Sequence, residues 1–364
     1  MNHFRISRRA LCLPALTLCA ALLWSCGDDN DSNPSGPSVG ADGSVSLAAP
    51  AAGQGIQVVI GPFDVPSGQE VQRNYYQKLP IDQDIYVTKI ELTYNVGSHH
   101  LNIFKSDDLD LADRVEDSFS AIAWESWDMI VASQRESLTW TLPPGTAIHL
   151  KAHQQMNFQT HYVNAITQKT STGTGKAVIN FYTTDKSKVT NLIGAVFANN
   201  RKVELPPHSE STFRKVVVPF TQDAEILWMT GHFHGWGKSF VVNRWDGTTA
   251  GEEVYRNSTW AEPPVKFYDP PLKVKAGESL VYTTTHVNGT DNIVKFGPHV
   301  ETDEHANLFV FYTPSANASK SVYDFTGGEV VSSTTIKGLA LDPMSERLAK
   351  RVVGESFCKE VVGQ

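Results

Sequence analysis

The chain has 364 residues, of which 41% are hydrophobic and 19% are charged, and its formal net charge is −8. This is enough apolar material for one large or two medium domains rather than a single small core, and two domains are expected. The acidity argues against nucleic acid as a partner, because contacts to phosphate need clustered lysine and arginine.

The first 25 residues are typical of an export signal, since three arginines precede an apolar run over residues 10–24. The segment Leu23-Trp24-Ser25-Cys26 resembles a bacterial lipobox, in which the cysteine is lipidated. We therefore expect an exported protein of the bacterial cell envelope, periplasmic or on the surface, held to a membrane by a lipid on Cys26. Ordinary signal cleavage is the alternative. A twin-arginine signal, which delivers a folded protein, is a further reading of Arg8 and Arg9.

Residues 26–54 contain many Asp, Asn, Ser, Pro and Gly residues, which predicts a flexible tether. Loss of the signal removes three arginines and no acid, so the mature chain has a formal charge of −11. Two of the four cysteines leave with the signal and Cys26 carries the lipid, which leaves Cys358 alone. No intramolecular disulfide is therefore available to the folded part.

From residue 55 to residue 335 short alternating or apolar runs are separated by turn residues, which predicts a mainly β fold. The clearest runs are 56–59, 86–94, 178–182, 214–218, 239–245, 280–285 and 308–312. A polar stretch near residues 183–190 divides the strands into two parts of sandwich size, which we place at 55–186 and 187–340. The tail 341–364 has apolar residues among charges and predicts a short helix capped by Asp342.

Vicinal histidines stand in the first half, at His99 and His100, and are followed by His161 on an alternating run. Neighbours on a regular strand point to opposite faces, so His99 and His100 can share an ion only at a bulge or a strand end, near Gly97. The alternative is that one of the pair is buried and hydrogen-bonded while the other faces solvent.

His232 and His234 stand in the second half, in Gly231-His232-Phe233-His234-Gly235, and are followed by His305. Residues i and i+2 of a strand share a face, so His232 and His234 can hold one ion together. The flanking glycines permit a close backbone approach. Two separate three-histidine metal sites are the natural interpretation, although imidazole alone suits zinc, copper, iron and nickel.

These segments resemble, in consistent order over about residues 55–314, the copper type II, ascorbate-dependent monooxygenases, which include the peptidylglycine hydroxylating and dopamine β-monooxygenases. The segments that carry the resemblance are Ser98-His99-His100-Leu101-Asn102-Ile103-Phe104, Phe158-Gln159-Thr160-His161-Tyr162, Gly231-His232-Phe233-His234-Gly235-Trp236-Gly237-Lys238 and Asp303-Glu304-His305-Ala306-Asn307-Leu308. The family fold consists of two jelly-roll-like β-sandwiches that face each other across a solvent-filled cleft. The resemblance therefore implies two jelly-roll-like antiparallel sandwiches with one copper site in each.

The resemblance also implies a role for each histidine and two copper ions per chain. His99, His100 and His161 would hold the electron-transfer copper. His232, His234 and His305 would hold the oxygen-activating copper, as catalytic residues, and Gln159 would assist from the cleft side. The implied reactants are O2, an external reductant similar to ascorbate, and a small-molecule or peptide-like substrate.

The departures from the family concern the second site. The family's last ligand is a methionine, whereas this chain has His305, and imidazole serves oxidised copper and zinc better than a soft thioether does. The arginine and tyrosine that read a substrate carboxylate are replaced by Thr230 and Phe309, although Asn307 is retained, which argues against a glycine-extended peptide. Trp236, Thr230 and Asn307 are the candidate substrate contacts.

Three hypotheses follow from these residues. The first is an exported dicopper monooxygenase that hydroxylates a C–H bond of a small organic substrate. The second is a surface lipoprotein that binds copper for storage or sensing without turnover. The third is a zinc-dependent enzyme at the second site, because three imidazoles with an open fourth position can activate water.

Overall fold

The computed structural model describes residues 38–39, 45–119, 126–164, 172–260, 263–315 and 321–336. These described residues belong to one compact unit. The predicted signal, Cys26, Cys358 and the predicted helix in 341–364 lie outside the described residues. In the described part, no helix has the length and apolar character needed to cross a membrane.

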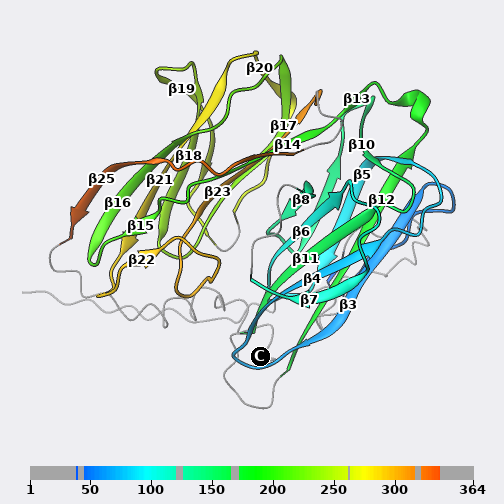
Figure 1. The fold of residues 1–364 in the computed structure, drawn as a ribbon, viewed down its shortest axis with the longest axis horizontal. Coiled ribbons are helices and arrows are strands. Elements are labelled where there is room, and N and C mark those ends of the chain that lie inside the picture. Colours follow the sequence, from blue (N-terminus) through cyan, green and yellow to red (C-terminus); the bar gives the residue numbers. More distant parts are fainter. Residues whose placement is uncertain are drawn as a thin grey trace, which may run out of the picture. The chain divides into compact units, whose positions relative to one another are not determined.

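The first half of the described chain forms two sheets of mostly antiparallel strands (Figure 1). One sheet has the order β13-β10-β5-β12-β3, with β9 also paired to β5, and the other has the order β7-β4-β11-β6-β8. The strands of the first sheet are β3 (Gly55–Val65), β5 (Ile85–Tyr94), β9 (Ser137–Thr141), β10 (Thr146–Leu150), β12 (Gly173–Thr184) and β13 (Asn191–Leu192). Those of the second are β4 (Glu70–Lys78), β6 (Ser98–Ser106), β7 (Arg114–Asp117), β8 (Asp128–Ser133) and β11 (Gln155–Val163).

The second half repeats the arrangement with two five-stranded sheets, β20-β17-β23-β14-β24 and β19-β18-β21-β16-β25, and a short pair β15-β22. The inner sheet contains β14 (Gly194–Asn199), β17 (Ala224–Phe233), β20 (Lys266–Val274), β23 (Ala306–Thr313) and β24 (Ser321–Asp324). The outer sheet contains β16 (Ser209–Val216), β18 (Gly237–Trp245), β19 (Ala250–Asn257), β21 (Ser279–Asn288) and β25 (Glu329–Thr335), and the pair is β15 (Glu204–Leu205) and β22 (Val294–Lys295). The mainly β fold with two jelly-roll-like antiparallel sandwiches is thus confirmed.

Each of the seven predicted apolar runs overlaps a strand, and the change from the first sandwich to the second falls between β13 and β14. The tether is shorter than expected. Residues 38–39 (β1) pair with Val45–Ser46 (β2), and the side chains of Val45 and Leu47 are buried against Val178 of β12. Asn180 also donates a hydrogen bond to the Ala48 carbonyl, so the chain from residue 45 onward is attached to the first sandwich.

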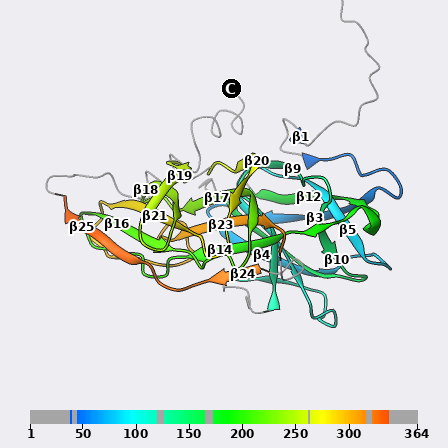
Figure 2. The ribbon, with the colours of Figure 1, turned by 90° about the horizontal axis from the view of Figure 1, so that it is seen from above.

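The central strands of the inner sheet are buried on both faces, whereas its edge strand β20 is largely exposed. Every residue of β14 and β23 is buried, and β17 is buried at all but one position. Figure 2 shows β14, β17 and β23 between the outer sheet of the second sandwich and the strands β3, β5 and β12 of the first. One face of this sheet packs inside its own sandwich, and the other contributes Phe197, Trp228 and Phe311 to the core of the first sandwich.

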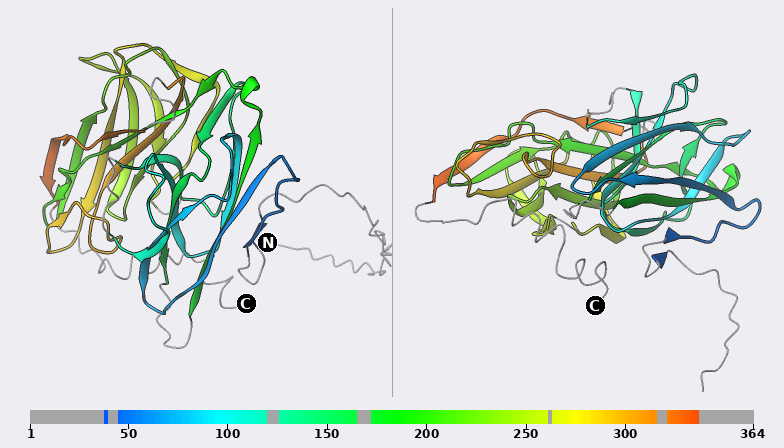
Figure 3. Two further views of the ribbon diagram at one scale, coloured as in Figure 1. Left: turned by 45° about the vertical axis from the view of Figure 1, so that its right-hand side comes forward. Right: turned by 90° about the horizontal axis from the view of Figure 1, so that it is seen from below.

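The two sandwiches therefore share one continuous core instead of meeting only across a solvent-filled cleft. Trp228 stacks on Phe311 at 4.4 Å and meets Trp140 of the first sandwich edge to face at 5.5 Å between ring centroids. Buried aromatic contacts of this kind contribute beyond their buried area. The views in Figure 3 also show strands of both halves side by side.

Hydrogen bonds join β8 of the first sandwich to β24 of the second. The Met129 backbone N–H donates to the Ser321 hydroxyl at 2.8 Å, and the Ser321 N–H donates to Asp128 at 2.7 Å. The Tyr323 hydroxyl donates to the Trp127 carbonyl at 2.6 Å. These polar contacts at the edge of the shared core fix the register of one sandwich against the other.

Candidate metal centre

The first histidine set lies on β6 and β11, where a register shift brings three rings together. His100 is directly opposite His161, but Ser98 is opposite Tyr162, so His99 is the extra residue of a bulge. Gly97, which has φ +94° in the left-handed region that favours glycine, begins this bulge. The predicted bulge beside Gly97 is confirmed, and it lets His99 and His100 approach His161 together.

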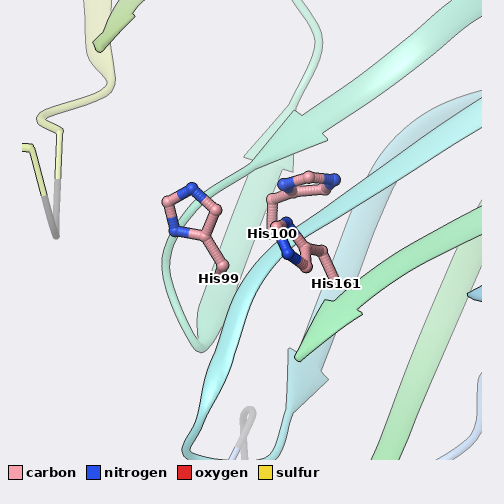
Figure 4. A group of neighbouring side chains, drawn as sticks. All are labelled: His99, His100 and His161. Carbon is pink, nitrogen blue, oxygen red and sulfur yellow. The ribbon is translucent and has the colours of Figure 1, made fainter. Parts of the chain in front are cut away.

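Figure 4 shows the ring of His99 to one side of the pair formed by His100 and His161. The ring centroid of His161 lies 5.2 Å from that of His99 and 4.9 Å from that of His100. One candidate ligand nitrogen from each of the three lies within 4.8 Å of the others. The first half of the chain thus has the geometry of a three-imidazole metal site.

The second set lies where β17 and β23 pair. His232 is opposite Asn307 and Phe233 is opposite Ala306, so His234 and His305 are one position beyond the last pair. The His305 ring centroid is 3.9 Å from that of His234 and 4.7 Å from that of His232. His305 therefore lies beside the other two, as the order of the motifs predicts.

Gly231 lets the strand approach its neighbours next to this set. A Cβ added there would lie 2.6 Å from the ring of Phe240 on β18, which is closer than carbon atoms approach. The Gly231 carbonyl also accepts a hydrogen bond from Asn257 at 2.9 Å. Because the backbone is held on both sides, the direction of the His232 side chain is set by packing.

The two sets lie against one another and form one cluster. The ring centroid of His99 is 5.1 Å from that of His232 and 5.9 Å from that of His234. His99, His232 and His234 also satisfy the 4.8 Å separation between candidate ligand nitrogens, whereas His305 belongs to neither such group. The sequence predicts two separate sites, and the shared core of the sandwiches is the physical reason that the rings meet.

Several of these imidazoles carry a buried ring nitrogen with no hydrogen-bond partner among the described residues. They are His99 Nε2, His161 Nδ1, His232 Nδ1 and His305 Nε2. A buried polar atom without a partner is costly, and a metal ion removes that cost. The residues present therefore fit a metal ion of the class that imidazole binds.

Five of the six imidazoles are kept uncharged by their surroundings. Burial lowers the pKa of His99, His100, His232 and His305 well below the ordinary value of 6.5, and the neighbouring imidazoles lower it further. Burial also lowers the pKa of His234, although Glu304 opposes the shift. Neutral imidazole is the form that binds metal, so the rings are ready to do so at neutral pH.

Polar neighbours hold the rings of the first set in place. Glu70 Oε1 lies 2.7 Å from His161 Nε2, which leaves Nδ1 of that ring for a metal. Gln159 Oε1 lies 3.3 Å from His100 Nε2 and accepts from Asn102 at 3.2 Å. Burial raises the pKa of Glu70, but the hydrogen bond and the electrostatic interaction with His161 outweigh burial and lower this pKa below 4.5. A carboxyl group on the far nitrogen of a ligand fixes the ring and strengthens it as a donor.

Glu304 holds the second set through the backbone. Its side chain is fully buried, and Oε1 accepts the N–H groups of His234 at 2.5 Å and His305 at 2.8 Å. Its Oε2 lies 3.3 Å from Nδ1 of the equally buried His286. The Asp303 carbonyl lies 2.7 Å from His234 Nδ1, which leaves Nε2 of that ring for a metal.

A cavity of about 200 Å³ lies beside the rings, and all six histidines line it. Gln159, Thr230 and Asn307 also line it, as expected for candidate site residues. Thr230 donates to the Pro264 carbonyl at 3.1 Å, and Asn307 Oδ1 accepts from Asn199 at 2.5 Å. The polar lining also includes further amides and the guanidinium of Arg201.

Trp236 is not brought to this cavity. Its side chain is only 2% exposed and packs in the core of the second sandwich. The Gly237 N–H donates to the His234 carbonyl and the Val287 N–H donates to the Trp236 carbonyl, so the turn directs the indole inward. Met229 is also part of that core.

Sequence reasoning misses several residues at the site. Met129, Phe197 and Phe325 form much of the apolar wall, and no spacing in the sequence connects them with the histidines. The stacked rings of Phe197 and Phe309, 4.7 Å apart, come from paired positions on β14 and β23. Glu70 lies 91 positions before His161, and only the pairing of β4 with β11 brings it near.

We expect Glu70→Gln to weaken metal binding at the first set by about 10- to 100-fold, the usual cost of losing a carboxyl partner behind a ligand. The measurement is a competition titration against a metal chelator. The matched control is Glu91→Gln, because Glu91 lies on β5 and contacts Lys89 and Tyr182 instead of a histidine. Equal affinities for the two variants would contradict a role of Glu70 in holding His161.

Comparison with known proteins gives no family for this chain. No known protein family and no curated protein matches the sequence. The major capsid protein P2 from bacteriophage PM2 aligns at 10% identity and a TM-score of 0.32, over 72% of this chain and 100% of its own. N-glycanase F (PNGase F) aligns at 10% identity and a TM-score of 0.29, over 75% and 98%. Likenesses this weak carry no argument about function.

Proposed function

We propose that the protein is a copper-dependent monooxygenase that hydroxylates a C–H bond of a small organic substrate with O2 and an external reductant similar to ascorbate. The observation that carries the proposal is the gathering of six imidazoles, several with unpartnered buried nitrogens, on the wall of one cavity. The resemblance of the four histidine segments to the copper type II monooxygenases gives the metal and the reaction class.

Two copper ions would be held by six histidines and would supply one-electron transfer and oxygen activation when bound. The six are His99, His100, His161, His232, His234 and His305. The chain's own contribution is the positioning of the ligands. Glu70 and Gln159 orient the rings of His161 and His100, and Glu304 fixes the backbone of the second set. Preorganised ligands lower the cost of ordering the site when metal and substrate bind.

The cavity wall supports a substrate that is small and largely apolar. Phe197, Phe309, Phe325 and Met129 line one side, and no carboxylate occurs in the described lining. A substrate amine would therefore lack a charged partner there. Thr230 and Asn307 offer a hydroxyl and an amide next to the rings, which suits a polar group on the substrate. Arg201 is the one charged side chain besides the histidines in the described lining.

The test is oxygen uptake by copper-loaded full-length protein with ascorbate and a panel of small aromatic and aliphatic compounds. We expect substrate-dependent uptake with one hydroxylated product per O2 consumed, and loss of that activity in His232→Ala. Uptake that no substrate stimulates would contradict the proposal. Zinc in place of copper, in protein purified without added metal, would instead favour the zinc-dependent alternative.

A copper-binding protein without turnover is the second candidate, and His305 is the residue that favours it. A third imidazole stabilises oxidised copper relative to a thioether ligand, which opposes reduction. Copper that stays oxidised in the presence of ascorbate, or that is reduced but does not react with O2, would support storage or sensing.

We expect His305→Met to raise the ratio of Cu(I) to Cu(II) affinity by about tenfold or more, because sulfur is the softer ligand. Competition titrations with chelators specific for each oxidation state would measure this ratio. His208→Met is the control, since His208 lies 2.7 Å from the exposed Asp291 and away from the cavity. An unchanged ratio in His305→Met would show that His305 is not a ligand.

We also propose that the protein acts in the bacterial cell envelope, attached by a lipid on Cys26. The proposal rests on the arginine-rich start, the apolar run and the Leu23-Trp24-Ser25-Cys26 segment. Mass spectrometry of the mature N-terminus, with Cys26→Ser as the matched variant, would test it. A mature chain that begins elsewhere and carries no lipid would contradict the anchor.

A further inference from the structure

His99 is the ring at which the two histidine sets meet. Its centroid lies 5.2 Å from His161 and 5.6 Å from His100 on one side, and 5.1 Å from His232 and 5.9 Å from His234 on the other. The two groups whose candidate ligand nitrogens lie within 4.8 Å of one another both contain His99. No other histidine of the described chain belongs to both groups.

The backbone explains why His99 has this position. It is the extra residue of the bulge between β6 and β11, so it does not follow the alternation that turns His100 towards His161. In Figure 4 its ring lies apart from the other two of its set. A bulge redirects a side chain, and here the redirected ring reaches the second sandwich.

Hydrogen-bond partners on one ring nitrogen hold three of the other rings. His161 has Glu70, His100 has Gln159 and His234 has the Asp303 carbonyl. His99 Nε2 is buried and has no hydrogen-bond partner among the described residues. His232 Nδ1 and His305 Nε2 are unpartnered in the same way, so the feature that distinguishes His99 is its place in both groups of candidate ligand nitrogens.

The geometry points to His99 as a ligand common to both sets, which would bind one ion through each ring nitrogen as an imidazolate, with its N–H proton released to solvent. Two bound metal ions would then form one coupled centre instead of two independent sites. The inference rests on the proposed occupation of both sets by metal. Ions held this close in a buried site repel one another strongly, and a shared ligand links their occupancies. Metal bound at one set therefore changes the affinity at the other, and by reciprocity the effect is equal in both directions.

The test uses two backgrounds, each of which keeps one set. His100→Ala/His161→Ala leaves the second set, and His232→Ala/His234→Ala leaves the first. Adding His99→Ala should weaken Cu(II) or Zn(II) binding by at least about tenfold in both backgrounds, measured by competition with a chelator. If either background binds metal equally well with and without His99, then His99 belongs to one set alone and the inference fails.

A measurement on the unaltered full-length protein removes any dependence on how the variants fold. With two Cu(II) ions bound, the integrated electron paramagnetic resonance signal should fall clearly below that of two isolated ions, because neighbouring spins interact. Two full, non-interacting signals would overturn the inference. Neither measurement uses O2 or a substrate, so an inactive protein can still meet the expectation, and an active enzyme with independent ions would fail it.

Discussion

Metal-free protein is expected to lose several kcal/mol of stability as the pH falls from about 7 to 5.5. Folding lowers the pKa of His99, His100, His232, His234 and His305 below 6.5, chiefly through burial. At a pH below about 6.5 these histidines bind protons in the unfolded chain but stay unprotonated in the folded protein, so unfolding becomes more favourable. Each such imidazole therefore contributes a loss of roughly 1.4 kcal/mol per pH unit.

Urea unfolding in the presence of a chelator, at several values between about pH 8 and 5.5, would measure this slope. The window lies above the ordinary pKa of 4.5 for a group such as Glu70, so carboxyl titration does not obscure it. Stability that is constant across the window would show that the rings are not buried together in the neutral form.

Copper-loaded protein is the matched control, because a bound metal competes with protons for the same nitrogens. Loading should move the loss of stability to lower pH. At a free metal concentration about 1,000 times the dissociation constant it should also add about 4 kcal/mol. If the unfolding free energy changed with pH at the same slope with and without metal, the groups that titrate would not be the metal ligands.

Glu304→Ala is expected to lower the free energy of unfolding by about 2–5 kcal/mol. The change removes the acceptor of two buried N–H groups, those of His234 and His305, and each unsatisfied donor costs about 1–3 kcal/mol. It also leaves a cavity beside the fully buried His286. Urea unfolding at neutral pH and fixed metal content would measure the difference.

Glu304→Gln is the informative companion, since its amide oxygen can still accept both N–H groups and should recover most of the stability. Glu301→Ala controls for the loop, because Glu301 is exposed and only three residues away. If Glu304→Ala and Glu301→Ala had the same free energy of unfolding, the backbone of the second set would not depend on the Glu304 carboxyl group.

Much of the fold could be predicted because each strand carries its own signal. The alternation in residues 86–94 and the unbroken apolar run in 308–312 lie on strands of the observed sheets. The alternation of side chains along a strand likewise predicts that His232 and His234 lie on the same face. It also yields the need for a bulge at His99, since side-chain direction depends on only two or three neighbouring residues.

What could not be predicted depends on contacts between distant strands. The meeting of the two histidine sets requires the central strands β14 and β23 of the second sandwich to be buried on both faces, and apolar runs alone do not distinguish this from an ordinary core. Trp236 between two glycines gives no sign of which way its turn directs the indole. Val45 and Leu47 are too few apolar residues to mark the end of a tether, yet they pack on β12.

The register of the strands has one further consequence. His100 faces His161 across β6 and β11, and His234 and His305 are adjacent at the end of the β17–β23 pairing. A slip of one residue in either pairing would turn an imidazole to the opposite side of its sheet. The three-imidazole geometry of each set is thus present only in a chain whose strands are correctly aligned, so the metal affinity proposed for the protein depends on these two registers.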